Sequence, residues 1–241
     1  MTGRVSSAPA ADTAPDGRPA ILAVDAGRVA YEEALRWQRL LVVARLEDRV
    51  DDVLLTLEHD PVYTAGRRAD IVANVLGTRD IPVVRVDRGG DVTYHGPGQL
   101  VAYPLVKLRS SKQVRPYVEG LEEACVRAAA DFGVRARPST RSATGAGRRR
   151  TGVWVGDEKL AAVGVRVHRR VTSHGLALNV TTNLDDFGGI VPCGIADAGV
   201  CSLRSLGVET TVNQVRARLV EHLGDLLGRR PRPALPAELG L

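Results

Sequence analysis

Residues 152–180, GVWVGDEKLAAVGVRVHRRVTSHGLALNV, form the most strand-rich part of the sequence. Residues 153–155 favour a strand, Gly156-Asp157 are turn residues, and strand-favouring residues resume over 160–167. Two such runs joined by a short Gly-containing turn predict a β-hairpin, whose strands are antiparallel. A further strand is expected over 175–180. This pattern is not typical of an all-parallel, doubly wound sheet.

Helical and strand patterns alternate outside this stretch. Apolar residues at helical spacing predict three helices, over residues 29–49, 114–132 and 211–227. Short apolar runs predict four more strands, over residues 20–24, 53–57, 83–86 and 100–106. Thr211 and Gln214 fit a capping box at the start of the last helix. The pattern indicates an α/β fold of the α+β type, with a mixed, largely antiparallel sheet flanked by helices.

The domain organisation follows from length and local composition. Residues 1–19 are rich in Ala, Pro and polar side chains, and we expect a disordered N-terminal extension there. Residues 20–228 are expected to form one folded domain of the 241-residue chain. Residues 229–241, RRPRPALPAELGL, lack a periodicity that could bury a face, so we expect a poorly ordered Pro- and Arg-rich tail. Residues 139–150, STRSATGAGRRR, are predicted to form a mobile loop.

Composition excludes several classes of protein. No run of about 18 apolar residues is present, so we expect no membrane-spanning helix. The first residues lack the apolar stretch of a secretory signal, which indicates a cytoplasmic protein. Three cysteines do not form a disulfide framework in a chain of this length, so reduced thiols are expected. The net charge of +5 suits an acidic partner but does not choose among nucleic acid, anionic lipid and protein.

Motifs for nucleotides and metals are missing from the sequence. It contains no G-x-x-x-x-G-K-[ST] loop, and no G-x-G-x-x-G follows a predicted strand with a suitably placed acidic residue. His168 and His174 are six positions apart, and Cys193 and Cys201 are eight apart, unlike the paired ligands of structural zinc sites. We therefore expect no bound metal, and nothing in the sequence requires a nucleotide.

The densest group of unusual residues is RGGDVTYHGPGQLVAYPL, residues 88–105. Its four glycines predict tight turns and allow a ligand or another backbone to approach closely. One interpretation is a substrate-binding turn that presents His95 and backbone amides. The other is a Gly-rich hairpin with a surface histidine, and the spacing alone favours neither.

Cys193 is the cysteine best placed for chemistry. It lies in IVPCG, residues 190–194, where the neighbouring Pro and Gly predict a rigid, accessible turn. A nucleophilic thiol needs access and a positive neighbour that stabilises the thiolate. Cys125 falls on the apolar stripe of a predicted helix, and Cys201 has no turn or charge signature nearby, so both are expected to be packing residues.

Lys159 is the candidate positive neighbour. The chain has 33 Lys and Arg residues, of which only Lys107, Lys112 and Lys159 are lysines. Arg cannot replace Lys where the group must also accept a proton, because guanidinium stays charged. The alternative is a solvated lysine beside the predicted hairpin turn, which is common for lysines. His174 precedes a strand and is expected either to line the same pocket or to be a structural histidine.

Four segments together resemble the octanoyltransferases of lipoate biosynthesis, also called lipoyl(octanoyl) transferases, in order and spacing. They are residues 88–105, 151–167, 174–180 and 190–194, and the resemblance extends over 20–227. It implies a biotin/lipoate protein ligase-like fold. The family's cysteine nucleophile matches Cys193, and its lysine partner matches Lys159. Its acyl-substrate contacts match Arg88, Gly89, Gly90, Asp91, Val92, Thr93, Tyr94, His95, Ala162, Val163, Gly164, Gly175, Leu176 and Ala177.

The resemblance also implies a reaction and its partners. An octanoyl group would pass from acyl carrier protein, through a thioester on Cys193, to a lysine of a lipoyl domain in 2-oxoacid dehydrogenase complexes or of glycine cleavage H protein. No cofactor is expected, because the donor thioester is already activated, and we expect a monomer that binds neither nucleic acid nor membrane. The alternatives are an ATP-dependent lipoate- or biotin-type ligase and a non-catalytic module that binds acyl groups or lipoyl domains.

Overall fold

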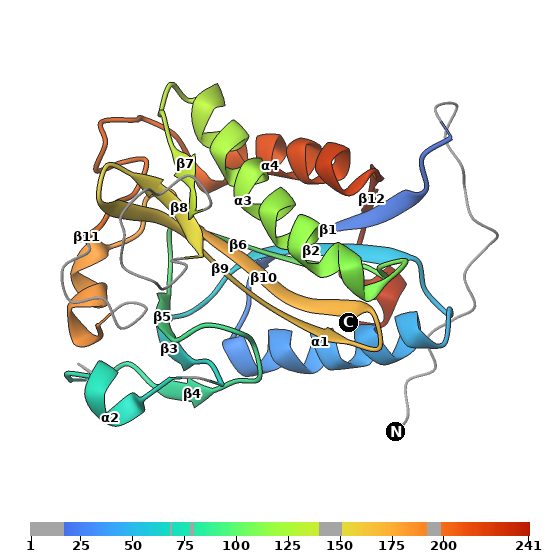
Figure 1. The fold of residues 1–241 in the computed structure, drawn as a ribbon, viewed down its shortest axis with the longest axis horizontal. Helices are drawn as coiled ribbons and strands as arrows, with labels where there is room; N and C mark the ends of the chain where they lie inside the picture. Colours follow the sequence, from blue (N-terminus) through green and yellow to red (C-terminus); the bar gives the residue numbers. More distant parts are fainter. Residues whose placement is uncertain (1–16, 68, 78–79, 140–150, 192–198) are drawn as a thin grey trace.

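The computed structural model describes residues 17–67, 69–77, 80–139, 151–191 and 199–241 (Figure 1). Most of the expected N-terminal extension and of the expected loop at 139–150 lies outside these residues, and so does Cys193. Within the described residues no helix is long and apolar enough to cross a membrane.

One large sheet forms the centre of the molecule. Its strands are β1 (Ala20–Arg28), β2 (Asp52–Glu58), β6 (Gln99–Leu105), β7 (Arg137–Pro138), β8 (Gly152–Val155), β9 (Glu158–His168), β10 (Val171–Asn179), β11 (Gly199–Val200) and β12 (Arg230–Ala234). The order is β12-β1-β2-β6-β10-β9-β8-β7, and β11 pairs with β9. The pairs β12–β1, β1–β2 and β11–β9 are parallel, and the other pairs are antiparallel. The expected mixed, largely antiparallel sheet is confirmed, as is the hairpin at Gly156-Asp157.

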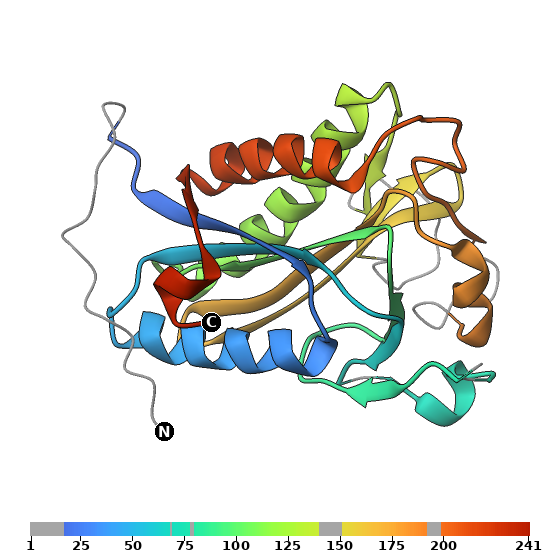
Figure 2. The ribbon, with the colours of Figure 1, turned by 180° about the vertical axis from the view of Figure 1, so that it is seen from behind.

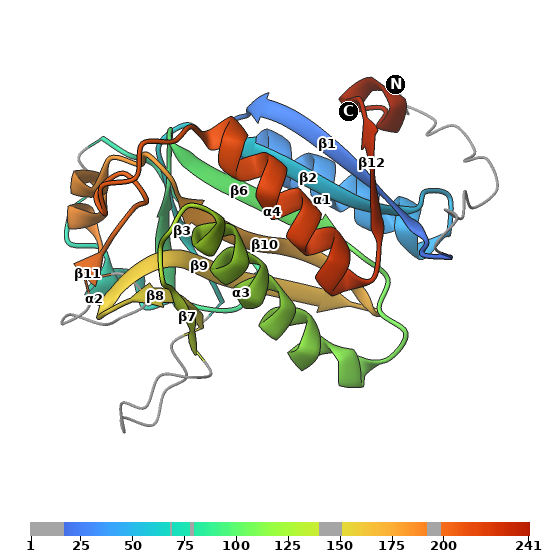
Figure 3. The same cartoon turned by 90° about the horizontal axis from the view of Figure 1, so that it is seen from above.

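Helices cover both faces of this sheet. Helix α1 (Tyr31–Leu46) lies on one face, and α3 (Val114–Asp131) and α4 (Val212–Leu227) lie together on the other (Figures 1 and 3). The expected capping box of α4 is present, because Thr211 and Gln214 satisfy each other's backbone groups. Cys125 is buried between α3 and the sheet, as expected for a packing residue.

A second, three-stranded sheet lies at one end of the large one, near β11 (Figure 1). It contains β3 (Val62–Ala65), β4 (Val83–Arg85) and β5 (Val92–His95), in the order β4-β3-β5. The short helix α2 (Ile71–Asn74) and the 3-10 turn η3 (Leu184–Gly189) accompany it, while η1 (Ser111–Gln113) precedes α3. Sequence analysis missed β3 and β5, because each has four residues and β5 follows directly on a Gly-rich turn.

The C-terminal segment is ordered, and the prediction of a poorly ordered tail over 229–241 is wrong. Strand β12 pairs in parallel with β1, and the turn η5 (Pro236–Leu239) follows it beside α1 (Figure 2). Ala234 at the end of β12 and Leu239 of η5 are buried in the same apolar cluster as Ala34, Leu41 and Ala44 of α1. Pro231 and Pro233 belong to this edge strand, where one side of the backbone needs no N–H donor. The prolines that argued against structure are therefore compatible with a strand at the sheet edge.

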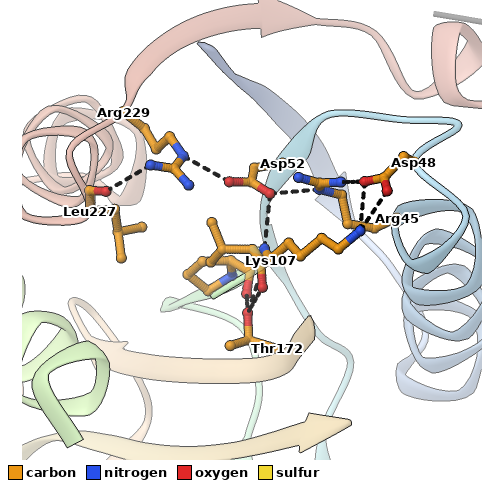
Figure 4. Close-up of polar contacts among 9 residues, drawn as sticks. Arg45, Asp48, Asp52, Lys107, Thr172, Leu227 and Arg229 are labelled. Atoms are coloured by element: carbon orange, nitrogen blue, oxygen red, sulfur yellow. Dashed lines mark hydrogen bonds and ion pairs between the residues drawn. The ribbon is translucent and has the colours of Figure 1, made fainter. Parts of the chain in front are cut away.

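Asp52 links three parts of the chain at the start of β2 (Figure 4). Its buried carboxylate accepts from Arg45 Nε at the end of α1 and from Arg229 Nε just before β12, both at 2.7 Å. It also accepts from the Lys107 backbone N–H at 3.0 Å. Lys107 Nζ in turn lies 2.6 Å from Asp48. The carboxylate thus ties the C-terminal segment and α1 to the sheet.

Replacing Asp52 by Asn should lower the free energy of unfolding by about 3 kcal/mol, since two arginines would lose their buried anionic partner. Urea denaturation measures this change. Asp51→Asn, at the neighbouring position outside this network, is the control and should change stability by less than about 0.5 kcal/mol. Equal effects of the two substitutions would contradict the role assigned to Asp52.

Candidate functional site

Lys159 is a buried residue of β9. Only 5% of its surface is exposed, and its Nζ lies 4.8 Å from the centre of the Trp154 ring. A cation above an indole face is attracted by the ring quadrupole. Gly152 lets β8 approach β9 closely, because a Cβ there would lie 2.6 Å from the Ala161 carbonyl oxygen. The alternative of a solvated turn lysine is therefore wrong.

The chain on both sides of Cys193 is held in place, although Cys193 itself is outside the described residues. Before it, Ile190 forms a β-bridge with Val75, and the Val191 N–H donates to the Asn74 carbonyl oxygen at 2.9 Å. After it, Val200 of β11 pairs with Lys159. The segment that contains Cys193 therefore starts at α2 and ends beside the buried lysine.

Arg88 organises the Gly-rich turn that the sequence singled out. Its buried guanidinium donates from Nη1 to the carbonyl oxygens of Gly89 and Asp91, at 3.0 and 2.8 Å. From Nη2 it donates to the carbonyl and hydroxyl oxygens of Thr64 on β3, at 2.7 and 2.8 Å. The turn therefore surrounds the Arg88 guanidinium, and these hydrogen bonds hold its backbone conformation.

Glycines let this turn pack directly on the large sheet. The Gly89 N–H donates to the Val165 carbonyl oxygen at 2.9 Å. A Cβ on Gly164 would lie 2.9 Å from the Gly89 carbonyl oxygen of the turn. Within the large sheet, a Cβ on Gly175 of β10 would lie 2.2 Å from the Ala102 carbonyl oxygen of β6. Such close approach of backbones requires residues without a side chain.

The structure brings the three predicted acyl-contact segments together. Residues 162–164 of β9 lie opposite residues 175–177 of β10 in register, with Gly164 facing Gly175 across the pair. Gly89 of the first segment contacts β9 at Gly164 and Val165. The side chains of Val92, Thr93, Tyr94 and His95 are buried in β5.

Tyr94 holds the segment that leads toward Cys193. Its hydroxyl donates to Asp186 Oδ2 at 2.7 Å, and the Tyr63 hydroxyl donates to the Asp186 carbonyl oxygen at 2.6 Å. Burial, followed by the Asp186 carboxylate, raises the pKa of Tyr94 above its usual range. Asp91 accepts from Asn74 Nδ2 at 3.0 Å. Sequence analysis missed Tyr63, Asn74 and Asp186, because they lie in elements of four to six residues, too short to show a periodic pattern.

His95 belongs to a buried cluster of aromatic rings. Tyr31 stacks on His95 at 5.8 Å, and His59 meets the same ring edge-on at 5.6 Å. His59 Nδ1 donates to the Val29 carbonyl oxygen at 2.8 Å and Nε2 accepts from the Tyr103 hydroxyl at 2.7 Å. Burial lowers the pKa of His59 to about 4 and that of His95 well below its usual value. The alternative of a surface histidine at 95 is therefore wrong.

His174 lies beside this cluster in a constrained backbone conformation. Its φ of 56° is in the left-handed region, inside a strand. The Gln38 side-chain oxygen accepts its backbone N–H at 2.7 Å, and His174 Nε2 lies 3.0 Å from Asp87 Oδ1. Burial lowers the pKa of His174, against the opposing effect of Asp87. Outliers of this kind persist only where the surroundings hold them, and they gather at functional sites.

Comparisons with known proteins give matches over most of the chain. The family model for the lipoyl protein ligase A/B catalytic domain matches residues 30–224. The octanoyltransferase of Acidobacterium capsulatum is 47% identical over 196 residues, covering 73% of this chain and 76% of the relative. The octanoyltransferase of Thermobifida fusca is 43% identical over 223 residues, covering 86% of this chain and 91% of the relative.

Solved lipoate ligases share the fold. The crystal structure of lipoate-protein ligase A bound with ATP has a TM-score of 0.68 at 16% identity, covering 91% of this chain and 90% of that one. The putative lipoate protein ligase Ta0514 from T. acidophilum, with bound lipoic acid, gives the same TM-score and identity, covering 90% and 88%. At this identity the likeness concerns the arrangement of helices and strands alone.

Gly175→Ala should lower the free energy of unfolding by about 1–3 kcal/mol, because the new Cβ would force β6 away from β10. Gly120→Ala on α3 is the matched control. A Cβ there would come no closer than 4.0 Å to a neighbouring atom, and Ala favours a helix by about 1 kcal/mol. Urea denaturation should therefore give opposite signs for the two substitutions, and the same sign would contradict this interpretation.

The buried histidines should make stability depend on pH. Their folded-state pKa values lie below the unfolded value of about 6.5, so their contribution is present above that pH and is lost as the pH falls. We expect the free energy of unfolding to fall with the pH below about 6.5, by at most about 1.4 kcal/mol per pH unit for each histidine. Urea titrations at several pH values measure the slope. His168→Gln, at an exposed position, should leave it unchanged, and a flat profile in the wild type would contradict the prediction.

Proposed function

The chain belongs to the lipoyl protein ligase A/B catalytic-domain family and is an octanoyltransferase, and from this premise we propose how its residues transfer the octanoyl group. It is an acyltransferase that acts in protein lipoylation. The observation that carries the proposal is the burial of Lys159 beside β11, the strand that follows the segment containing Cys193.

In the first half-reaction Cys193 is the nucleophile. Its thiolate attacks the thioester carbon of an octanoyl group carried on acyl carrier protein, and the carbon–sulfur bond to the phosphopantetheine breaks. The departing thiolate takes a proton from the Lys159 ammonium. An octanoyl thioester on Cys193 and a neutral Lys159 remain. A neighbouring ammonium favours the thiolate form of a cysteine, which supports this pairing.

In the second half-reaction a lysine of the acceptor protein attacks the acyl-enzyme. That lysine arrives as ammonium and must lose a proton before its nitrogen is nucleophilic. Lys159, neutral after the first half-reaction, accepts this proton. Its burial supports the role, because a buried side chain is held in one place beside the segment that contains Cys193. An arginine at this position would stay charged and could not act.

Backbone amides stabilise the tetrahedral oxyanion in both half-reactions. In the Gly-rich turn the Gly89 N–H already donates to Val165, and the Val92 N–H donates to the Asp91 carboxylate at 2.8 Å. These two amides are engaged in holding the turn. We assign the role to amides beside Cys193 and to other amides of the Gly-rich turn.

The two half-reactions also define the protein partners. The donor is octanoyl-acyl carrier protein, and the acceptors are lipoyl domains of 2-oxoacid dehydrogenase complexes and the glycine cleavage H protein. The reaction requires no cofactor and no ATP, because the thioester is already activated. The enzyme acts as a monomer in the cytoplasm. Its net charge of +5 supports association with acidic protein partners.

Octanoyl-acyl carrier protein should octanoylate Cys193 without ATP. Intact-mass measurement after incubation of the enzyme with octanoyl-acyl carrier protein alone is expected to show one octanoyl adduct. Cys193→Ser should lack the adduct, whereas Cys201→Ala, which removes a buried packing thiol, should retain it. An adduct that requires ATP would favour a ligase, and binding without any adduct would favour a non-catalytic module.

Lys159→Arg should lower overall transfer by at least about a hundredfold, because the guanidinium keeps the charge but cannot accept the acceptor lysine's proton. Steady-state octanoylation of a lipoyl domain measures this loss. Lys112→Arg, at an exposed position before α3, is the control and should transfer at the wild-type rate. Near-normal turnover of Lys159→Arg would remove Lys159 from the role of base.

A further inference from the structure

The strand pair β8–β9 contains a β-bulge beside Lys159. Val153 pairs with Ala161, whereas the next residue, Trp154, pairs with Lys159. The register thus shifts by one residue, and Leu160 is the extra residue of the bulge. An undisturbed register would pair Trp154 with Leu160, and successive side chains of a strand point to opposite faces. The bulge therefore places Trp154 and Lys159 directly opposite each other, with their side chains on the same face.

The backbone of Lys159 is held from both sides. On the side away from β8, Val200 of β11 pairs with Lys159, and the Cys201 N–H donates to the Lys159 carbonyl oxygen at 3.0 Å. Strand β8 is itself anchored at its first residue, because the Gly152 N–H donates to the buried Glu122 carboxylate of α3 at 2.7 Å. The strands on each side of Lys159 therefore leave its side chain as the part that can still move.

The end of the Lys159 side chain lies over the Trp154 ring. A flexible stem of four carbons loses conformational entropy when its ammonium is held in one place, and burial leaves this side chain little contact with water. Nζ lies 4.8 Å from the centre of the ring, and the attraction between a cation and an indole face is stronger where water is excluded. Contact with the ring face therefore both fixes the amine and replaces part of its lost hydration.

An indole ring suits an amine that must exchange a proton. A carboxylate beside the ammonium would accept a hydrogen bond from it and would compete for its proton. The indole nitrogen of Trp154 is a donor only, so the ring offers no lone pair that could take the proton. The ring face attracts the cation through its quadrupole alone. It can therefore fix the place of Nζ and leave the proton available for transfer.

We propose that Trp154 is a positioning residue for octanoyl transfer, whose ring holds the Lys159 ammonium in one place without competing for the proton that Lys159 exchanges. This inference rests on the role proposed above for Lys159. Trp154 acts on that amine alone, and no bond to it forms or breaks. The β-bulge at Leu160 is the backbone feature that brings the ring and the amine together.

NMR spectroscopy measures the contact independently of turnover. The chain has only three lysines, Lys107, Lys112 and Lys159, so 13C-lysine labelling gives a simple spectrum. The ring current of Trp154 should move the Lys159 Hε signals upfield, and Trp154→Leu should remove this shift. Trp37→Phe, which alters the other tryptophan, on α1, is the control and should leave the shift unchanged. Lys159 Hε signals at an ordinary position in the wild type would overturn the proposal.

Two substitutions separate the ring face from the space that the ring fills. Phe and Leu are both smaller than Trp and leave a cavity, but only Phe keeps an aromatic face. Trp154→Leu should lower the kcat of octanoyl transfer to a lipoyl domain by about tenfold, and Trp154→Phe should lie between it and the wild type. KM for the lipoyl domain should stay unchanged, because Trp154 acts on Lys159 rather than on the substrate. Equal losses of kcat in the two variants would indicate packing alone and would overturn the proposal.

Fluorinated tryptophan tests the ring without leaving a cavity. Fluorine withdraws electrons from the ring face and weakens its attraction for a cation, while the shape of the ring changes little. The chain has two tryptophans, so incorporation into Trp37→Phe labels Trp154 alone. The rate of transfer should fall stepwise as the number of fluorine atoms increases, and a constant rate would overturn the proposal. Incorporation into Trp154→Phe labels Trp37 alone and is the control, whose rate should not depend on fluorine.

Failure of this inference and failure of the proposed function give different results. A wild-type enzyme that forms no Cys193 adduct with octanoyl-acyl carrier protein would overturn the proposed function, while the NMR measurement would still decide whether Trp154 holds Lys159. A wild-type enzyme that forms the adduct, but whose rate is the same with every fluorinated Trp154, would overturn the role of Trp154 alone.

Discussion

The guanidinium of Arg88 joins the two sheets of this protein, and the geometry of the site depends on that connection. On one side it binds Thr64 of the small sheet, and on the other it holds the carbonyl groups of the turn that packs on β9. A buried cation is tolerated only where hydrogen bonds replace its hydration. The backbone oxygens of the turn meet that need, so the shape of the turn and the burial of the charge support each other.

This buried charge also sets the electrostatic conditions of the site. Burial lowers the pKa of His95 and His174 most, and the nearby Arg88 charge lowers both further. The histidines are therefore neutral at physiological pH and act as hydrogen-bonding groups rather than cations. Lys159 Nζ lies against the Trp154 ring, 4.8 Å from its centre.

The fold alone does not decide the chemistry. Lipoate ligases that share this arrangement of helices and strands at 16% identity include one bound with ATP, whereas the curated relatives above 40% identity are octanoyltransferases. Function therefore depends on the residues at the site rather than on the fold. A route through a cysteine thioester needs a thiol and a lysine at the site, and it does not need a nucleotide-binding site.

The sequence by itself determined the fold class, the three long helices, the hairpin at Gly156-Asp157 and the position of the Gly-rich segment. Those features follow from periodicity and turn chemistry, which are local. Only the tertiary structure decided that the C-terminal tail is a strand, that His95 and Lys159 are buried, and that Gln99 links His95 to Asn179. The physical reason is that burial and hydrogen-bond partners depend on residues distant in the chain, such as Asn179 and Gln99, 80 positions apart. No local pattern records such a pairing.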